Sequence, residues 1–284
     1  KLIYVNNCSY RKTAISMKTI ITFLLILLSF SSVLAQRNDR NPHYFKTDKN
    51  IVKVNATSPI IGNYAFQYER VLNKRLSAAV SYRFMPESNI PFKSRLIDLS
   101  DDKDAATDAI ENTKLSNYAF TPELRIYLGK KGYGKGFYIA PFFRHAKYSA
   151  SQFRIKYDIE SPDPNYVYSG TLDLSGDLTA NTFGLLIGAQ WFLGKRVILD
   201  WWIIGPHAGS GKGNLTGISD RLLTDLEQRE IYDKLEDIEI PFADKTVEVN
   251  SRGANMKLDG LWGGLRAGLS IGVKFWYSAI ISYF

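Results

Sequence analysis

Residues 260–275 alternate along their length between apolar side chains and side chains that are small or charged. Successive side chains of a β-strand point to opposite faces, so Leu265 and Leu269 share one face while Arg266 and Lys274 share the other. A long strand that is apolar on one face only is typical of a closed barrel in an outer membrane, where lipid surrounds the wall and the lumen is polar. This stretch restricts the possible folds more than any other feature of the chain.

The N-terminal segment has the pattern of a secretory signal. A lysine, a short apolar run and several small residues follow one another before Gln36. We therefore predict an over-extended start over residues 1–16, a signal peptide over residues 17–35 and a periplasmic tail over residues 36–49. The competing interpretation is a transmembrane helix, which needs about 20 apolar residues, and the run is shorter than that.

Charge and cysteine content exclude several classes of protein. The formal net charge is +8, and four of the basic residues lie within residues 1–35, so removal of the signal would leave +4. This mild charge argues against a nucleic-acid partner. The single cysteine, Cys8, lies before the predicted cleavage site, which excludes a disulfide scaffold, a cysteine nucleophile and a thiolate zinc site. We predict no cofactor and no metal site.

The same two-sided alternation recurs along the rest of the chain. It predicts an all-β fold, an eight-stranded antiparallel transmembrane β-barrel over residues 50–275, with residues 276–284 as a C-terminal extension. The predicted strands cover residues 51–60, 64–72, 76–84, 118–128, 137–148, 182–191, 197–203 and 261–275.

The connections between these strands differ in length in a regular way. Short turns are predicted at residues 73–75, 129–135 and 194–195, and long external loops at residues 85–114, 151–178 and 207–257, with the short turn at 61–63 as an exception. Short periplasmic turns and long external loops are expected of an outer-membrane barrel. Apolar spacing within residues 218–239 predicts a helix in the last loop, rich in acidic residues. That helix is either a solvated element over the barrel mouth or a surface for a cationic or metal-bridged partner.

The charged residues of the strands favour a membrane barrel over a soluble one. A soluble lipocalin-like barrel would place apolar side chains inside, whereas here each strand charge lies opposite an apolar face. The predicted lumen charges are Glu69, Arg83, Glu123, Arg125, Asp200 and Arg266. The lumen of eight strands has room for side chains only, so we interpret these charges as an ion-paired plug, and the alternative is a path for protons or ions.

Two histidines are candidates for chemistry at the external rim. His145 and His207 both fall on the outward face of their predicted strands, and Ser149 and Ser151 follow His145 on the same face. A serine beside a histidine base would suit a lipid-modifying enzyme, but spacing places no acidic residue to orient the base. We therefore assign no catalytic residue and keep the two histidines as a possible rim site.

Several strings of residues resemble those of a known family. They lie at residues 63–73, 121–129, 136–142, 199–202 and 264–268. Together they are similar to a Bacteroides-type outer-membrane β-barrel family of OmpA/OmpX-like size, described only as a domain of unknown function. The resemblance implies a barrel fold, a bacterial outer-membrane location and an association with surface fimbriae or envelope assembly. It supplies no catalytic residues.

These observations together give one functional expectation and two alternatives. We expect a non-enzymatic, monomeric outer-membrane protein in contact with membrane lipid, with a structural or surface-interaction role that supports an extracellular or fimbrial partner. A lipid-modifying enzyme that uses His145 or His207 is the first alternative, and a small-solute channel is the second.

Overall fold

The computed structural model describes residues 49–100, 107, 110–130, 132–160, 167–237 and 242–275. All of these belong to one compact unit, Phe45–Phe284. The predicted over-extended start, the signal peptide, nearly all of the tail and the C-terminal extension lie outside the described residues.

The described elements are mostly β-strands, and all strand pairs are antiparallel. The strands are β1 (Asn50–Asn55), β2 (Tyr64–Val71), β3 (Leu76–Asn89), β4 (Lys114–Tyr127), β5 (Gly136–Glu160), β6 (Val167–Leu193), β7 (Val197–Ser219), β8 (Ala243–Asn250) and β9 (Gly253–Phe275). A 3-10 turn, η1 (Ser58–Ile61), follows β1, and the helices are α3 (Lys93–Leu99) and α5 (Asp225–Glu236).

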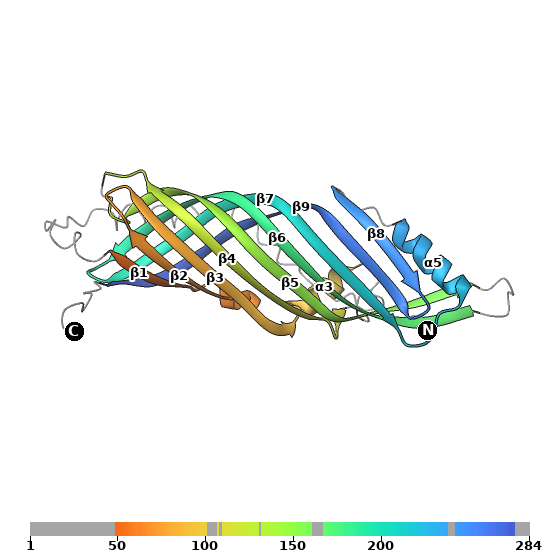
Figure 1. Cartoon of the computed structure of the whole chain (residues 1–284). Helices are drawn as coiled ribbons and strands as arrows, with labels where there is room; N and C mark the ends of the chain where they lie inside the picture. The colour runs from red at the N-terminus through yellow and green to blue at the C-terminus, as the bar shows by residue number, and fades with distance from the viewer. Residues whose placement is uncertain are drawn as a thin grey trace, which may run out of the picture. The chain divides into compact units, whose positions relative to one another are not determined.

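The sheet closes on itself through eight of its nine strands (Figure 1). Strands β1 to β7 pair in sequence order, β7 pairs with β9, and β9 returns to β1 through residues 270–275. The ninth strand, β8, lies outside the ring and pairs only with residues 253–260 of β9. The prediction of an eight-stranded closed sheet is thus confirmed for the ring, and β8 is an additional strand that the sequence pattern did not reveal.

Short turns join the strands at the end of the ring where β1 begins. The turn between β4 and β5 folds back over this end, since the backbone N–H of Tyr133 donates to the Lys74 carbonyl at 2.8 Å and the Gln190 amide donates to the Gly134 carbonyl at 2.7 Å. Gly132 and Gly134 have positive φ angles of 60° and 80°, which glycine adopts without strain. This turn therefore partly covers the ring at its short-turn end.

At the opposite end, the predicted long connection at residues 85–114 is largely confirmed, since β3 ends at Asn89 and β4 begins at Lys114, but the long loops predicted at residues 151–178 and 207–257 are largely wrong. The hairpin of β5 and β6 stays paired as far as Glu160 and Val167, and the hairpin of β7 and β9 as far as Ile218 and Gly253. Residues 208–214 of β7 are small or polar and lack an apolar face, whereas residues 153–160 of β5 do alternate between apolar and charged side chains, a signal that sequence reasoning missed. Backbone hydrogen bonding between neighbouring strands extends both hairpins.

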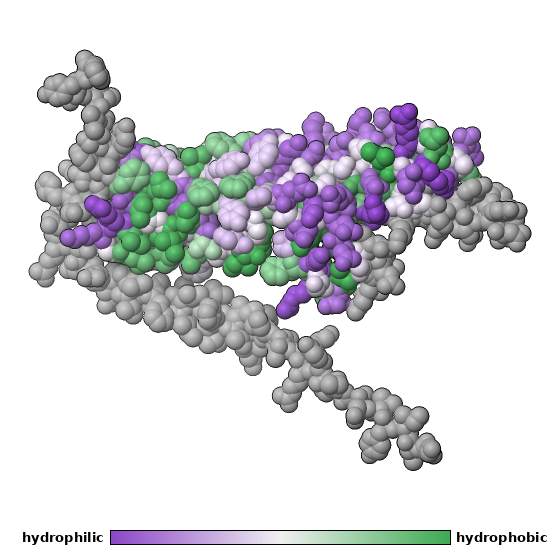
Figure 2. Space-filling view, turned by 90° about the horizontal axis from the view of Figure 1, so that it is seen from below, coloured by the Kyte–Doolittle hydropathy of each residue, from purple (hydrophilic) through white to green (hydrophobic). Residues whose placement is uncertain are grey.

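Burial alternates along the ring strands as the sequence predicts. On β4, Thr121, Glu123 and Arg125 are buried, whereas Phe120 and Leu124 are exposed. Large apolar side chains accordingly cover much of the outside of the ring. In Figure 2 they gather over the left-hand part of the visible face, and hydrophilic residues dominate its right-hand part, the end at which Figure 1 places the distal halves of the long strands.

Helix α5 packs on the distal part of the sheet. Its Ile231 and the preceding Leu223 form a buried cluster with Leu172, Leu174 and Ala254. Leu172, Leu174 and Thr182 are separated by even numbers of residues on β6, so their side chains lie on the same face of the strand. Thr182 points into the ring, and α5 therefore packs on the distal continuation of the inner face. The predicted helix is confirmed but is shorter than residues 218–239, because β7 continues to Ser219 and the chain begins the helix only after Thr224.

Among the described residues, no helix has the length and apolar character required to cross a lipid bilayer.

Candidate functional site

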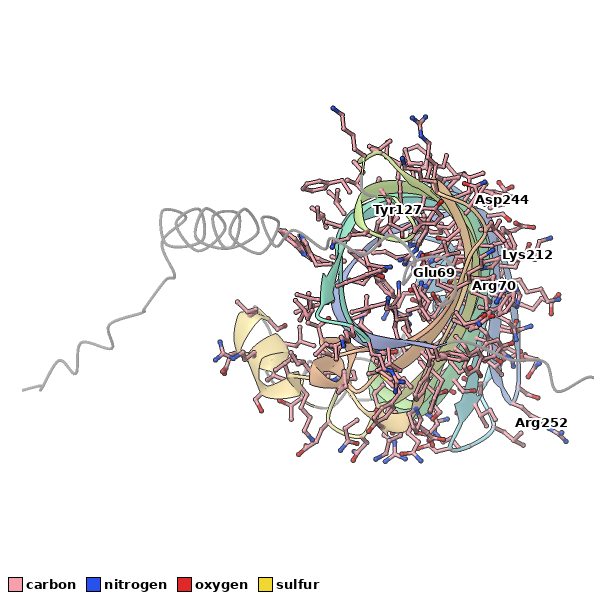
Figure 3. All side chains as sticks on the ribbon, turned by 90° about the vertical axis from the view of Figure 1, so that its left-hand side faces the viewer. Glu69, Arg70, Tyr127, Lys212, Asp244 and Arg252 are labelled. Atoms are coloured by element: carbon pink, nitrogen blue, oxygen red, sulfur yellow. The ribbon has the colours of Figure 1, made fainter. Side chains whose placement is uncertain are left out.

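The interior of the ring contains a cluster of charged residues from five strands. Strands β1, β2, β4, β7 and β9 supply them because each residue has inward parity on its strand. We call this the central cluster, and its members are Lys53, Glu69, Glu123, Arg125, Asp200 and Arg266. Figure 3 looks into the ring from its short-turn end and shows Glu69 inside it.

Lys53 lies at the centre of this cluster. Its ammonium group lies 2.5 Å from Glu69 Oε2 and 2.6 Å from Asp200 Oδ2, and it donates to Gln190 Oε1 at 2.5 Å. All three charged side chains are fully buried. The three donors of an ammonium group are thereby matched by three oxygen acceptors.

Arg125 connects the same carboxylates from the opposite wall. Its guanidinium group lies 2.7 Å from Asp200 Oδ2, 3.1 Å from Glu69 Oε2 and 2.6 Å from Glu123 Oε1. It also lies over the Tyr138 ring, 4.4 Å from the centroid. Arg266 closes the cluster by binding Glu123 Oε2 at 3.0 Å.

Neutral side chains satisfy the remaining carboxylate lone pairs. Tyr127 Oη donates to Glu69 Oε1 at 2.7 Å, and Ser77 Oγ donates to the same oxygen at 2.6 Å. Tyr138 Oη donates to Asp200 Oδ1 at 2.8 Å. The central cluster holds three cations and three carboxylates, so its formal charge is zero. A buried ionic group tolerates this environment only when it is both paired and hydrogen-bonded, and this cluster meets both conditions.

Sequence reasoning identified most of this cluster but missed its central cation. Lys53 was not among the predicted lumen charges, although it stands between Val52 and Val54, which are both exposed, and is itself 1% exposed. A lone lysine flanked by two valines in the first strand was the available signal. The strand was too short to show its alternation clearly, which is why the signal was overlooked.

Arg83 was predicted to join the ion-paired plug and does not. No described carboxylate lies within ion-pair distance of it, and its Nε is buried without a hydrogen-bond partner. Arg83 instead lines a cavity of about 290 Å³ next to the central cluster. The cavity lining also includes Arg144, Arg266, Tyr148, Trp202, His207 and Trp262.

The two histidines of the predicted rim site lie on opposite faces of the sheet. His145 points outward, where its Nδ1 lies 2.8 Å from Asn181 Oδ1. His207 was expected to point outward as well, and that prediction is wrong, because it lines the interior cavity and packs edge-on against the buried Phe142 at 5.9 Å. An irregularity between Trp202 and Gly205 adds a residue to β7, which reverses the parity of all later positions.

The serines near His145 do not form the arrangement that a nucleophile requires. Ser149 Oγ donates to Asp177, and Ser151 Oγ donates to Glu87 at 3.3 Å. Neither hydrogen bond involves a histidine. Within the described ranges, no group of three or more His, Cys, Asp or Glu side chains is placed to hold a metal ion.

The fold and the site define a closed antiparallel sheet that encloses a neutral cluster of paired charges and, beside it, a cavity lined by arginines. A family model described as a protein of unknown function (DUF3575) matches residues 20–211. The chain belongs to that family. The match ends within β7, so α5, β8 and β9 lie beyond the matched residues. No curated protein matches the chain.

Proposed function

We propose that this chain is a non-enzymatic, monomeric outer-membrane barrel whose distal hairpins form an external interaction surface that supports an extracellular, for example fimbrial, assembly. The observation that carries the membrane part of this proposal is the inverted distribution of side chains. Apolar side chains cover the outside of the ring, and the buried interior is ionic. Water would make such an outer surface unfavourable, whereas acyl chains would stabilise it.

The height of the apolar surface supports the same proposal. On β4 and the residue that follows it the outward side chains are apolar from Tyr118 to Leu128, and on β6 from Phe183 to Leu193. Each stretch has the length that a tilted transmembrane strand needs, about 9–11 residues.

A row of aromatic side chains lies at the distal edge of this surface. Tyr64 is paired with Phe84, and Phe84 is paired with Tyr118, so the three rings cross neighbouring strands at one level. The Tyr64 and Phe84 rings lie 5.6 Å apart. Aromatic girdles of this kind mark the boundary between hydrocarbon and headgroups in outer-membrane barrels.

The closed ring supports a role without conduction. Each strand of the ring pairs with a neighbouring strand on both sides over at least part of its length, and the central cluster occupies the interior around Lys53 and Asp200. An eight-stranded barrel leaves an interior that side chains fill. His145 and His207 lie on opposite faces of the sheet, so the two histidines do not form one site of the kind that the enzyme alternative would use.

The distal hairpins are the part available to a partner. At about 3.3 Å per residue, β5 is roughly 80 Å long and β6 roughly 90 Å long, far more than a bilayer core requires. Their distal halves continue the same sheet beyond the ring, β8 adds a strand to it, and α5 packs on it through a separate apolar cluster. This region is the structural basis for proposing an external surface.

Fractionation tests the membrane part of the proposal. The mature protein should sediment with outer membranes, resist carbonate extraction and migrate faster on a gel when unheated than when boiled. Recovery as a monomer in detergent-free periplasmic extract would contradict the location.

Excision of α5 and β8 tests the surface role. Residues 220–251 are replaced with a two-residue Gly-Asn turn, which joins the paired ends of β7 and β9. The ring should still insert, and surface assembly by cells that express only this variant should fail. The matched control is a variant with a shortened connection between β3 and β4. Normal surface assembly in the variant that lacks α5 and β8 would contradict the surface role.

A further inference from the structure

The cavity beside the central cluster contains positive charge that no described carboxylate balances. Three arginines, Arg83, Arg144 and Arg266, line it, and its lining contains no aspartate or glutamate. Arg266 is neutralised by Glu123. Because the central cluster is already neutral, Arg83 and Arg144 bring two further positive charges that are unmatched among the described residues.

Unsatisfied hydrogen-bonding atoms converge on the same cavity. Arg83 Nε, Arg144 Nε and His207 Nδ1 are each buried without a partner. Arg144 is only 5% exposed, and the hydrogen bond that its guanidinium group donates to Thr121 Oγ1 is long at 3.4 Å. Buried polar atoms normally have partners, and a buried cation without a counter-charge is costly. The arginines are also close enough to repel one another electrostatically.

Aromatic rings hold these cations in place. The Arg266 guanidinium lies over Trp202 at 4.7 Å and over Phe142 at 4.6 Å. Tyr148, which interacts with both Arg83 and Arg144, packs against Trp262 with centroids 5.7 Å apart. The cavity is therefore a built site with fixed donors rather than a gap between mobile side chains.

The strand pairing leaves this part of the wall open on one side. Strand β1 pairs with β9 only from residue 270 onward, and β8 pairs with β9 only up to residue 260. Between them, residues 262–268 of β9 have one neighbouring strand, β7, in the described part of the chain. Residues 262–267 also line the cavity. Thr57, Ser58 and Ile61 line the cavity as well, so the turn around η1, and not a paired strand, borders the cavity beside this edge.

We propose that this cavity binds a phosphoryl group through Arg83 and Arg144. A phosphate monoester carries a charge of about −1.5 to −2 at neutral pH, which balances the two unmatched arginines. The planar guanidinium group suits the paired oxygens of phosphate. The group comes either from a free phosphate compound or from a lipid headgroup, since both present the same oxygens. The site belongs to the ring itself and does not depend on the proposed surface role.

Calorimetry on the purified full chain in phosphate-free buffer and uncharged detergent tests this proposal. Inorganic phosphate and a short-chain phosphatidic acid are the two probes, and acetate is the monoanionic control. At least one phosphoryl probe should bind saturably and more tightly than acetate. If inorganic phosphate binds, a free phosphate compound is sufficient as the ligand. If only phosphatidic acid binds, the phosphoryl group comes from a lipid headgroup.

Four variants make the result specific. Arg83→Gln and Arg144→Gln should each weaken binding by at least about tenfold, because each removes charged donors. Arg252→Gln, on the exposed turn before β9 and labelled in Figure 3, should leave binding unchanged. Arg144→Lys keeps the positive charge but loses the planar pair of donors, so it should also weaken binding. This variant provides the test if the glutamine variants fail to fold.

Three results would overturn the proposal. The first is that neither phosphoryl probe binds saturably. The second is an affinity for acetate equal to the affinity for phosphate. The third is an unchanged affinity for the phosphoryl probe in the folded double variant Arg83→Gln/Arg144→Gln or in Arg144→Lys. Each variant is checked for folding by its heat-dependent migration before titration.

Discussion

Lys53 Nζ and Asp200 Oδ2 lie 2.6 Å apart, although 147 positions separate them in the chain and their strands, β1 and β7, are not neighbours in the sheet. Strand β9 stands between the two, so this ion pair reaches across the interior of the ring. The ion pair connects β1 to β7 across β9, the strand through which the sheet closes.

Lys53→Met tests the importance of that contact. The change leaves three buried carboxylates with two cations, so we expect the free energy of unfolding to fall by about 3–5 kcal/mol. Urea titration of tryptophan fluorescence in lipid vesicles measures it. Lys212→Met is the control, since Lys212 pairs with Asp259 in an exposed position and should change stability little. Equal effects of the two substitutions would contradict the central role of Lys53.

A double-mutant cycle of Lys53→Met and Glu69→Gln separates the pair from its surroundings. The two side chains lie 2.5 Å apart and share Asp200 and Arg125 as neighbours. We expect the double variant to be more stable than the sum of the single effects predicts, with a coupling of about 0.5–3 kcal/mol. Additive effects, measured by the same urea titration, would show that the two residues act independently.

Gly188→Ala tests the packing of the interior. A Cβ at this position would lie 2.4 Å from the Tyr138 ring and 2.8 Å from the Trp201 carbonyl. Tyr138 donates to Asp200, so its displacement should weaken the central cluster and lower the free energy of unfolding by about 1–3 kcal/mol. Gly129→Ala has no atom within 4 Å of the added carbon and serves as the control. A variant at Gly188 as stable as the control would contradict this account.

Ile231→Ala should loosen α5 without opening the ring. Ile231 is buried in the distal apolar cluster, and its truncation costs about 2–5 kcal/mol in such a setting. Hydrogen exchange should therefore increase in residues 221–237 and remain slow in the ring strands. Leu222→Ala is the control because Leu222 is 70% exposed. Faster exchange throughout the ring would show that α5 and the ring unfold as one unit.

The docking of α5 should weaken in acid through Glu227. Burial alone would raise the pKa of this carboxyl group, but hydrogen bonds from Arg221 and Thr224 outweigh it and lower the pKa below its ordinary value of 4.5. The carboxylate therefore stabilises the folded state fully above about pH 4.5, and this contribution is lost as the pH falls through the lowered pKa.

Limited proteolysis with pepsin between pH 2 and pH 5 measures this effect. Cleavage near α5 should increase toward low pH in the wild type, and Glu227→Gln should lose that part of the dependence. Glu230→Gln, a substitution on the same helix, is the control. A pH profile that Glu227→Gln leaves unaltered would assign the dependence to another group.

Local sequence pattern was sufficient for the ring but not for its extension. Alternation on β4 and β9 gave the correct inward residues because one face of each strand is apolar over many positions. Residues 153–160 of β5 alternate between apolar and charged side chains, but an irregularity in the pairing between Ala150 and Phe153 separates this pattern from the one in the first half of the strand. The pairing of β5 with β6 decides the matter.

Parity arguments also failed where the backbone departs from regular pairing. His207 was assigned to the outer face by counting from Asp200, and the extra residue after Trp202 reversed the count. Arg83 was assigned correctly to the interior, but its height along the ring relative to the carboxylates was not available from spacing. It therefore faces the cavity and not the central cluster.

By itself, the sequence determined that the chain forms two-faced strands with charges on the inner side, because side-chain direction in a strand depends only on the parity of neighbouring positions. Tertiary structure alone decided which charges meet. The stagger between strands sets the height of each side chain in the ring, and so joins Lys53 to Asp200 while it leaves Arg83 and Arg144 without a carboxylate among the described residues.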